Sequence, residues 1–136
     1  MAKKDQTEEV VEDQELSAEE LEEFKTRLLA ERENIRTRLS RHLNEAMVDT
    51  DRPADELDQA GRISDQAYLM RLADKEQKLL KQIDRALAKF DTGEFGLCEG
   101  TGEHISRKRL EVRPWTRYSI EHKEQLEREM GKSRRL

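Results

Sequence analysis

The sequence predicts a mainly α-helical protein, in which a long antiparallel coiled-coil hairpin is followed by a small finger-like globular domain and a C-terminal helix. Three observations support this fold class. Charged residues form 42% of the chain and hydrophobic residues 34%, which suits long helices that each bury a narrow stripe. Two long stretches with helical spacing of apolar residues are separated by one short segment that contains proline. A glycine-rich segment follows the second stretch.

The first helix has a clear start. Residues 1–16 are acidic and have little apolar periodicity, so we expect a disordered leader there. Ser17 and Glu20 then have the spacing of a capping box, which predicts that a helix begins at Ser17. Apolar residues recur from there at spacings of three, four or seven. This stripe consists of Leu21, Phe24, Leu28, Ile35, Leu39, Leu43 and Met47.

Residues 49–61 form the turn between the two helices and are the predicted tip of the hairpin. Pro53 lacks the N–H of an interior helical position and disfavours the helical conformation of the residue before it. Gly61 adds a second weak point for the helix. The tip is also strongly acidic, because it sets five carboxylates against one base, Arg52. These carboxylates belong to Asp49, Asp51, Asp55, Glu56 and Asp58.

A second apolar stripe marks the returning helix, which has no proline or glycine between Gly61 and Gly93. Its members are Ile63, Ala67, Met70, Ala73, Leu80, Ile83, Leu87 and Phe90. A short connection forces the two helices to run antiparallel, so residues 17–90 should form a coiled-coil hairpin. The alternative is two helices of a compact bundle. We expect a monomer, because the hairpin would cover its own stripe.

Residues 91–123 change in character and suggest a lost metal site. Four glycines crowd into ten positions, and a turn-rich segment of this kind usually needs a staple, commonly zinc. The spacing of two C-x-x-C pairs survives, but the positions hold Cys98 and Thr101, then Ser119 and His122. We expect residues 124–136 to form a short C-terminal helix and a tail with a basic end.

Several segments resemble the DksA/TraR family of bacterial transcription regulators. Residues 91–99 (DTGEFGLCE), 109–114 (RLEVRP) and 120–123 (IEHK) are similar to its zinc-finger domain. Residues 55–60 (DELDQA) match the D-x-x-D-x-A motif at the family's coiled-coil tip. The resemblance covers the chain after the leader and implies a protein that binds bacterial RNA polymerase directly. It further implies that the hairpin enters the secondary channel and brings Asp55, Asp58 and Ala60 near the active site to modulate initiation, without direct sequence-specific DNA binding.

The four zinc-ligand positions of the family hold one cysteine, one histidine and two hydroxyl residues here. Two hydroxyls cannot replace two thiolates at a structural zinc site, so we expect no zinc. We expect Thr101 and Ser119 to link the two turns by hydrogen bonds instead. The alternative is a residual zinc site formed by Cys98, His104 and His122.

Basic residues gather in the same segment and suggest an anion site. The resemblance implies that Arg109, Arg113 and Lys123 help to bind the alarmone ppGpp at the polymerase interface. The helix lysine that completes this set in the family is Gln82 here, which leaves open whether the cluster binds ppGpp or only contacts polymerase. Trp115 is expected to be a packing anchor.

Other functional classes are less well supported. No phosphate-binding glycine loop or nucleophile with a nearby base emerges, so we do not expect an enzyme. The net charge of −5 disfavours a protein that coats DNA. The absence of a long apolar run indicates no membrane span, and we expect a cytoplasmic protein. The alternatives are a structural coiled-coil adaptor and a transcript-cleavage factor of the same channel, whose paired acids would hold Mg²⁺.

Overall fold

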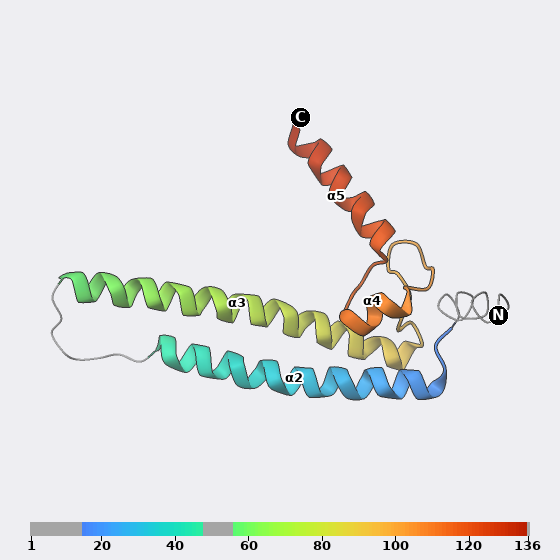
Figure 1. The fold of residues 1–136 in the computed structure, drawn as a ribbon, viewed down its shortest axis with the longest axis horizontal. Coiled ribbons are helices and arrows are strands. Elements are labelled where there is room, and N and C mark those ends of the chain that lie inside the picture. Colours follow the sequence, from blue (N-terminus) through green and yellow to red (C-terminus); the bar gives the residue numbers. More distant parts are fainter. Residues whose placement is uncertain (1–14, 48–55, 136) are drawn as a thin grey trace, which may run out of the picture. The chain divides into compact units, whose positions relative to one another are not determined.

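The structure, a computed structural model, describes residues 15–47 and 56–135. Within these residues lie four helices: α2 (Ala18–Ala46), α3 (Glu56–Thr92), α4 (Arg107–Val112) and α5 (Ile120–Arg135) (Figure 1). The predicted leader up to residue 14 and most of the predicted tip, including Asp55, lie outside the described residues. The prediction of a mainly α-helical fold with a helical hairpin and a C-terminal helix is confirmed.

The capping box at the start of α2 is also confirmed. The Ser17 N–H donates to Glu20 Oε1 at 3.2 Å, and the Glu20 N–H donates to Ser17 Oγ at 3.2 Å. Two N–H groups that a helix start leaves without partners are thereby satisfied. The chain divides into two compact units, to which both long helices contribute. We call residues 29–81 the hairpin unit. The described residues before 29, together with those from 82 onward, form the finger unit.

In the hairpin unit, α2 and α3 pack antiparallel through a narrow stripe (Figure 1). Ile35 of α2 is fully buried, and Ala46 and Ala73 are nearly so. Two polar contacts join the helices: Gln66 Nε2 donates to the Ala46 carbonyl at 3.1 Å, and His42 Nδ1 lies 2.9 Å from Glu76 Oε2. A thin apolar stripe with polar contacts beside it is the packing expected from the composition.

The prediction that the first residues of the second stripe face α2 is wrong. Ile63 and Met70 are 66% and 52% exposed, and Ala67 is exposed as well. The face of α3 that is buried or half-buried in this unit instead follows a different register. Its members are Arg62, Leu69, Leu72, Ala73, Glu76, Leu79 and Leu80. Adjacent residues are about 100° apart around a helix, so the register through Arg62 cannot also bury Ile63.

The finger unit has a small core of its own. Phe24 and Leu28 of α2, with Ile83 of α3, are buried in it. The Phe95 ring stacks on Phe90 with 4.2 Å between centroids, and lies 5.7 Å from the Phe24 ring. Further buried side chains come from the segment after α3: Cys98, Ile105 and Leu110.

Two helix starts in the finger unit depend on serine hydroxyls. Ser106 Oγ accepts from the Arg109 N–H and caps the short helix α4, which the sequence analysis did not predict. Ser119 Oγ accepts from the His122 N–H at 3.3 Å, so α5 begins at Ile120 rather than at residue 124. Serine is a favoured N-cap because its hydroxyl pairs an N–H that has no helical partner.

Candidate functional site

The four positions that correspond to the family's zinc ligands lie together in the finger unit. Cys98 is 2% exposed, and its sulfur accepts hydrogen bonds from the Thr101 side chain and from the N–H groups of Gly100, Thr101 and Ser119. The His122 ring lies against Gly100, so closely that a Cβ at position 100 would overlap it. The two turns at residues 98–101 and 119–122 therefore still meet, as the family's spacing implies.

The surroundings of Cys98 favour the thiolate. Burial raises the pKa of the Cys98 thiol, but the hydrogen bonds from Thr101, Ser119 and Gly100 outweigh burial and lower this pKa to about 6. An anion at this position is held by several converging N–H and O–H donors. These hydrogen-bond donors would also support a thiolate bound to a metal, but no second thiolate is available to bind the same metal.

The residues present do not fit a tetrahedral zinc site. Ser119 Oγ caps α5, and Thr101 Oγ1 accepts from the Glu103 N–H at 3.3 Å. Among the described residues no three His, Cys, Asp or Glu side chains form a group that could hold a metal ion. His104 therefore does not complete a set with Cys98 and His122, and the alternative of a residual zinc site has no support from this geometry.

Glu99 carries a different link between the two turns. Its N–H donates to the Arg117 carbonyl at 2.9 Å, and its carboxylate lies 2.6 Å from Arg117 Nε and 3.2 Å from Lys89 Nζ of α3. Burial raises the pKa of Glu99, but hydrogen bonds from Arg117 and Lys89 outweigh it, so the pKa is lowered. Ser119 does join the two turns through its N–H, which donates to the Cys98 sulfur, whereas the hydroxyls of Thr101 and Ser119 each serve their own turn.

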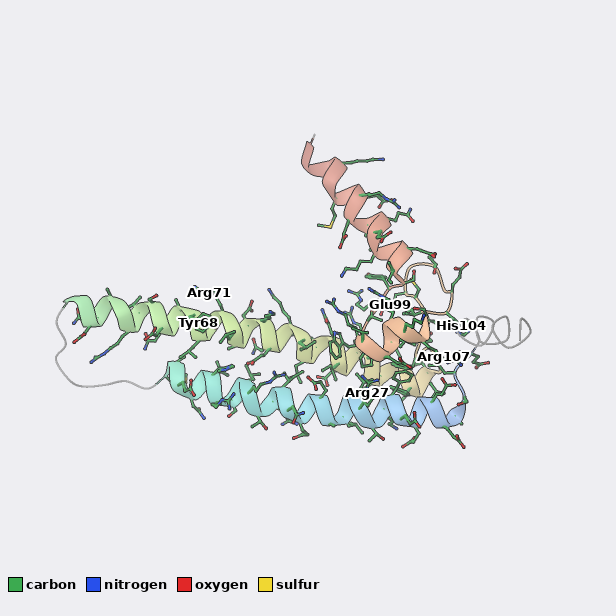
Figure 2. All side chains as sticks on the ribbon, viewed as in Figure 1. Arg27, Tyr68, Arg71, Glu99, His104 and Arg107 are labelled. Atoms are coloured by element: carbon green, nitrogen blue, oxygen red, sulfur yellow. The ribbon has the colours of Figure 1, made fainter. Side chains whose placement is uncertain are left out.

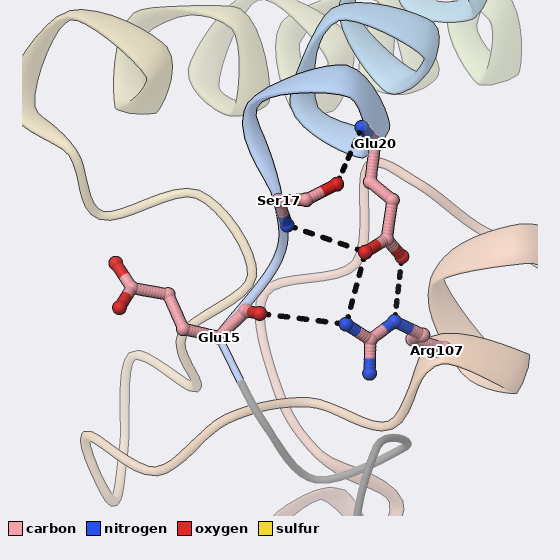
Figure 3. A network of polar contacts seen from close by, with 4 residues as sticks. All are labelled: Glu15, Ser17, Glu20 and Arg107. Carbon is pink, nitrogen blue, oxygen red and sulfur yellow. Dashed lines mark hydrogen bonds and ion pairs between the residues drawn. The ribbon is translucent and has the colours of Figure 1, made fainter. Parts of the chain in front are cut away.

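A second carboxylate, Glu20, joins α4 to the start of α2 (Figure 3). Arg107 Nε lies 2.6 Å from Glu20 Oε2, and Arg107 Nη2 lies 3.0 Å from Oε1 and 3.4 Å from the Glu15 carbonyl. The hydrogen bond from Arg107 is the main cause that lowers the pKa of Glu20 to about 2. Glu20 thus completes the capping box and anchors α4 with the same carboxylate.

The basic residues singled out from the sequence line one open pocket of about 310 Å³. It brings together Gln82 of α3, Arg109 of α4, Arg113, and Lys123 of α5. The remaining walls are formed by Trp115, Thr116, Arg117, Tyr118, Leu126, Glu127 and Met130. Four cationic side chains around one concave surface suit a multiply charged anion such as a phosphate ester.

Two features of this pocket go beyond the three residues that the family resemblance implies. Arg109 Nε donates to the Tyr118 carbonyl at 2.8 Å, so part of its guanidinium is already used to hold the wall in place. Arg117, which stacks on Tyr118 with 5.0 Å to the ring centroid, adds a fourth cation. Neither the Arg109–Tyr118 contact nor the pair of Arg117 and Glu99, which are 18 residues apart, has a local sequence signal.

At the predicted tip, only Asp58 and Ala60 fall within the described residues. Both lie in the first turns of α3 and are exposed. Asp55 is outside the described residues, so its position relative to Asp58 stays a prediction. Within the described part of the chain, no helix is long and apolar enough to cross a membrane.

Comparison with known proteins identifies both parts of the chain. Residues 20–90 match the N-terminal domain of the DnaK suppressor protein DksA, and residues 93–127 match the prokaryotic dksA/traR C4-type zinc finger. An RNA polymerase-binding transcription factor DksA of Caulobacter vibrioides is 38% identical over 80% of this chain and 77% of its own. The Escherichia coli protein of that name is 32% identical over 70% and 63%, respectively.

Solved structures agree with the sequence comparison. The structure of the transcription factor DksA2 from Pseudomonas aeruginosa is 37% identical and covers 80% of this chain and 84% of its own, with a TM-score of 0.71. The structure of an RNA polymerase binding protein and transcriptional regulator from Chlamydia trachomatis is 28% identical, with a TM-score of 0.53 over 85% and 96%. The chain belongs to the DksA/TraR family.

Proposed function

We propose that this protein is a bacterial transcription regulator that binds RNA polymerase directly through the secondary channel and acts without enzymatic activity. The observation that carries the proposal is that one chain matches both family models and is similar to relatives named for polymerase binding. We further propose that it acts as a monomer in the cytoplasm, where RNA polymerase works. We also propose that it does not bind DNA sequence-specifically.

The tip supplies the proposed effect on initiation. Asp58 and Ala60 are exposed at the start of α3, and Asp55 stands three positions before Asp58 in the sequence. Carboxylates placed near a polymerase active site repel DNA phosphates and attract the Mg²⁺ ions of that site. This arrangement would change the stability of promoter complexes without any chemical step by the protein.

The test separates binding from effect. Asp55→Asn combined with Asp58→Asn should leave folding and polymerase affinity nearly unchanged but abolish the effect on transcription from a ribosomal-type promoter in vitro. Ala60→Thr should behave alike, because it enlarges the small residue of the motif. Asp65→Asn is the matched control, since Asp65 is exposed on α3 outside the motif.

Full transcriptional activity in the double Asn variant would contradict the proposal and favour the structural adaptor. Cleavage of a backtracked transcript that depends on both aspartates would favour the cleavage factor. The adaptor also predicts that purified protein and polymerase do not form a complex in a competition binding assay.

We also propose that the basic pocket is an effector site for ppGpp at the polymerase interface. Support comes from its cations, which surround one concavity, and from the family positions Arg109, Arg113 and Lys123 in its wall. Gln82 lacks the positive charge found at that position in the family, and Glu127 adds a negative one, so the response should be weak. Arg113→Ala with Lys123→Ala should abolish it, and Gln82→Lys should strengthen it. A response unchanged in both variants would exclude this pocket.

Finally, we propose that the protein folds without zinc, although its finger belongs to a C4-type family. Support comes from Ser119 and Thr101, whose hydroxyls complete a helix cap and a turn. Further support comes from two contacts near the turns that a metal would join: the Ser119 N–H donates to the Cys98 sulfur, and Arg117 pairs with Glu99.

A further inference from the structure

The sulfur atoms of the described residues divide between exposed and buried positions. Cys98, the one cysteine of the chain, is 2% exposed, so its sulfur is shielded from oxidants in solution. Met47, Met70 and Met130 are 79%, 52% and 59% exposed, although methionine is usually buried. Access to solvent therefore favours oxidation of the thioethers over oxidation of the thiol.

Met130 differs from the other two methionines because it lies in the wall of the basic pocket. On α5 it follows Lys123 by seven residues and Leu126 by four, which places all three on one face of the helix. All three side chains line the pocket. Because helical side chains lean toward the N-terminus of their helix, Met130 leans along the wall toward Lys123 rather than away from it.

The cations of the pocket differ in how far their N–H groups are already used. Arg109 Nε donates to a backbone carbonyl at 2.8 Å, and Arg117 Nε donates to the carboxylate of Glu99 at 2.6 Å (Figure 2 labels Glu99). Within the described residues, no hydrogen bond or ion pair engages the side chain of Arg113 or Lys123. These two cations therefore have N–H groups to donate to an acceptor that enters the pocket.

We propose that Met130 is an oxidation site that regulates anion binding in the basic pocket. This inference rests on the proposed effector site and adds a control on it. As a thioether, Met130 is an apolar part of the wall and leaves Arg113 and Lys123 to a bound phosphate. As a sulfoxide, it offers an oxygen to the same two cations and lowers the affinity of the pocket for phosphate.

The oxidation is the transfer of one oxygen atom from a peroxide to the Met130 sulfur. The S–O bond forms while the O–O bond of hydrogen peroxide breaks, and the second oxygen leaves as water. The sulfur loses two electrons, and the peroxide is reduced by the same two electrons. Methionine sulfoxide reductases reverse this change, so the affinity of the pocket should return on reduction.

The test uses the full-length chain, with inorganic triphosphate as the anionic probe. Trp115 lines the same pocket and is the only tryptophan, so its fluorescence should report triphosphate binding, with titration calorimetry as a second measurement. Each protein is titrated before and after treatment with hydrogen peroxide, and mass spectrometry locates the oxidised residues. The unmodified protein should bind triphosphate about threefold to tenfold more weakly after treatment, because one acceptor then competes for its cations. A methionine sulfoxide reductase should restore the affinity.

Two variants separate Met130 from the other exposed thioethers. Met130→Leu keeps an apolar side chain in the wall but has no sulfur to oxidise, so peroxide should leave its affinity for triphosphate unchanged. Met47→Leu with Met70→Leu is the matched control, because both methionines are exposed but belong to the hairpin unit. This double variant should lose affinity on treatment as the unmodified protein does. Each protein is compared with its own untreated form, so the result does not depend on the starting affinity.

A Met130→Leu protein that loses as much affinity on treatment as the unmodified protein would overturn the inference. Peroxide that oxidises Met47 and Met70 but leaves Met130 intact would overturn it as well. Either result leaves the effector site standing, because that site is tested through Arg113 and Lys123 in transcription. An untreated protein that does not bind triphosphate would also overturn the inference, and if transcription does not respond to ppGpp either, the effector site fails with it.

Discussion

The finger unit and the hairpin unit are stabilised by different means. In the finger unit, Glu20 and Glu99 each join segments that are far apart in sequence, through Arg107 and through Lys89 and Arg117. In the hairpin unit, α2 and α3 pack through a stripe with polar contacts beside it, and large apolar side chains remain exposed. Charged pairs between separate segments thus hold the finger unit together beside its small core, whereas the hairpin unit depends on one narrow apolar stripe.

The two units should lose stability under different conditions. Ion pairs weaken when a carboxylate is protonated or when salt screens it, but burial of apolar side chains responds to neither in the same way. Trp115, the only tryptophan, belongs to the finger unit, so its fluorescence reports on that unit. Far-UV circular dichroism reports mainly on the long helices.

Leu110→Ala should give the largest effect. Leu110 is fully buried in the finger unit. The cavity left by the substitution should therefore lower the free energy of unfolding of this unit by about 2–4 kcal/mol. Ile35→Ala is the matched change in the hairpin unit, where Ile35 is equally buried. Urea titrations should show that Leu110→Ala shifts the Trp115 transition more than the helical one. If both probes shift together in both variants, the two units unfold together, and they are not independently stabilised.

Glu99→Gln should have the next largest effect, because it leaves Lys89 and Arg117 without their shared carboxylate. We expect a loss of about 1–2 kcal/mol in the free energy of unfolding that Trp115 fluorescence monitors. Glu103→Gln is the control from the same segment, since the Glu103 side chain is exposed. Equal stability of the two variants would remove Glu99 as a clamp.

Acid should act on the finger unit through Glu20. Because the pKa of Glu20 in the folded protein is lowered to about 2, its stabilising contribution is complete above the ordinary value near 4.5 and is lost as pH falls toward 2. The side chain is 34% exposed, so we expect only about 1 kcal/mol. Urea titrations from pH 6 to 3 should therefore show that the unmodified protein and Arg107→Met converge in stability. A constant difference across this range would contradict the role of Glu20.

Removal of metal should have no effect. A chelator should leave both the helical circular dichroism and the Trp115 fluorescence of the purified protein unchanged, and elemental analysis should find well under one zinc per chain. The reason is that one thiol and one imidazole supply only half of a tetrahedral ligand set. Stoichiometric zinc, with loss of the Trp115 signal in chelator, would show that the finger unit still depends on a metal.

The sequence by itself determined the helical hairpin, the capping box at Ser17 and the position of the two turns in the finger. These features depend on interactions within a few residues, or on apolar spacing that continues over many turns of a helix. The grouping of Arg109, Arg113 and Lys123 was likewise expected from the family resemblance, and the pocket contains all three.

Only the tertiary structure decided which face of α3 meets α2 and which partners the clamps use. Two apolar registers on α3 satisfy helical spacing, so periodicity alone could not choose between Ile63 and Leu69 for the interface. The pair of Glu20 and Arg107 spans 87 residues, and no local pattern encodes such a distance. The hydroxyl of Ser119 is a helix cap because α5 begins directly after it.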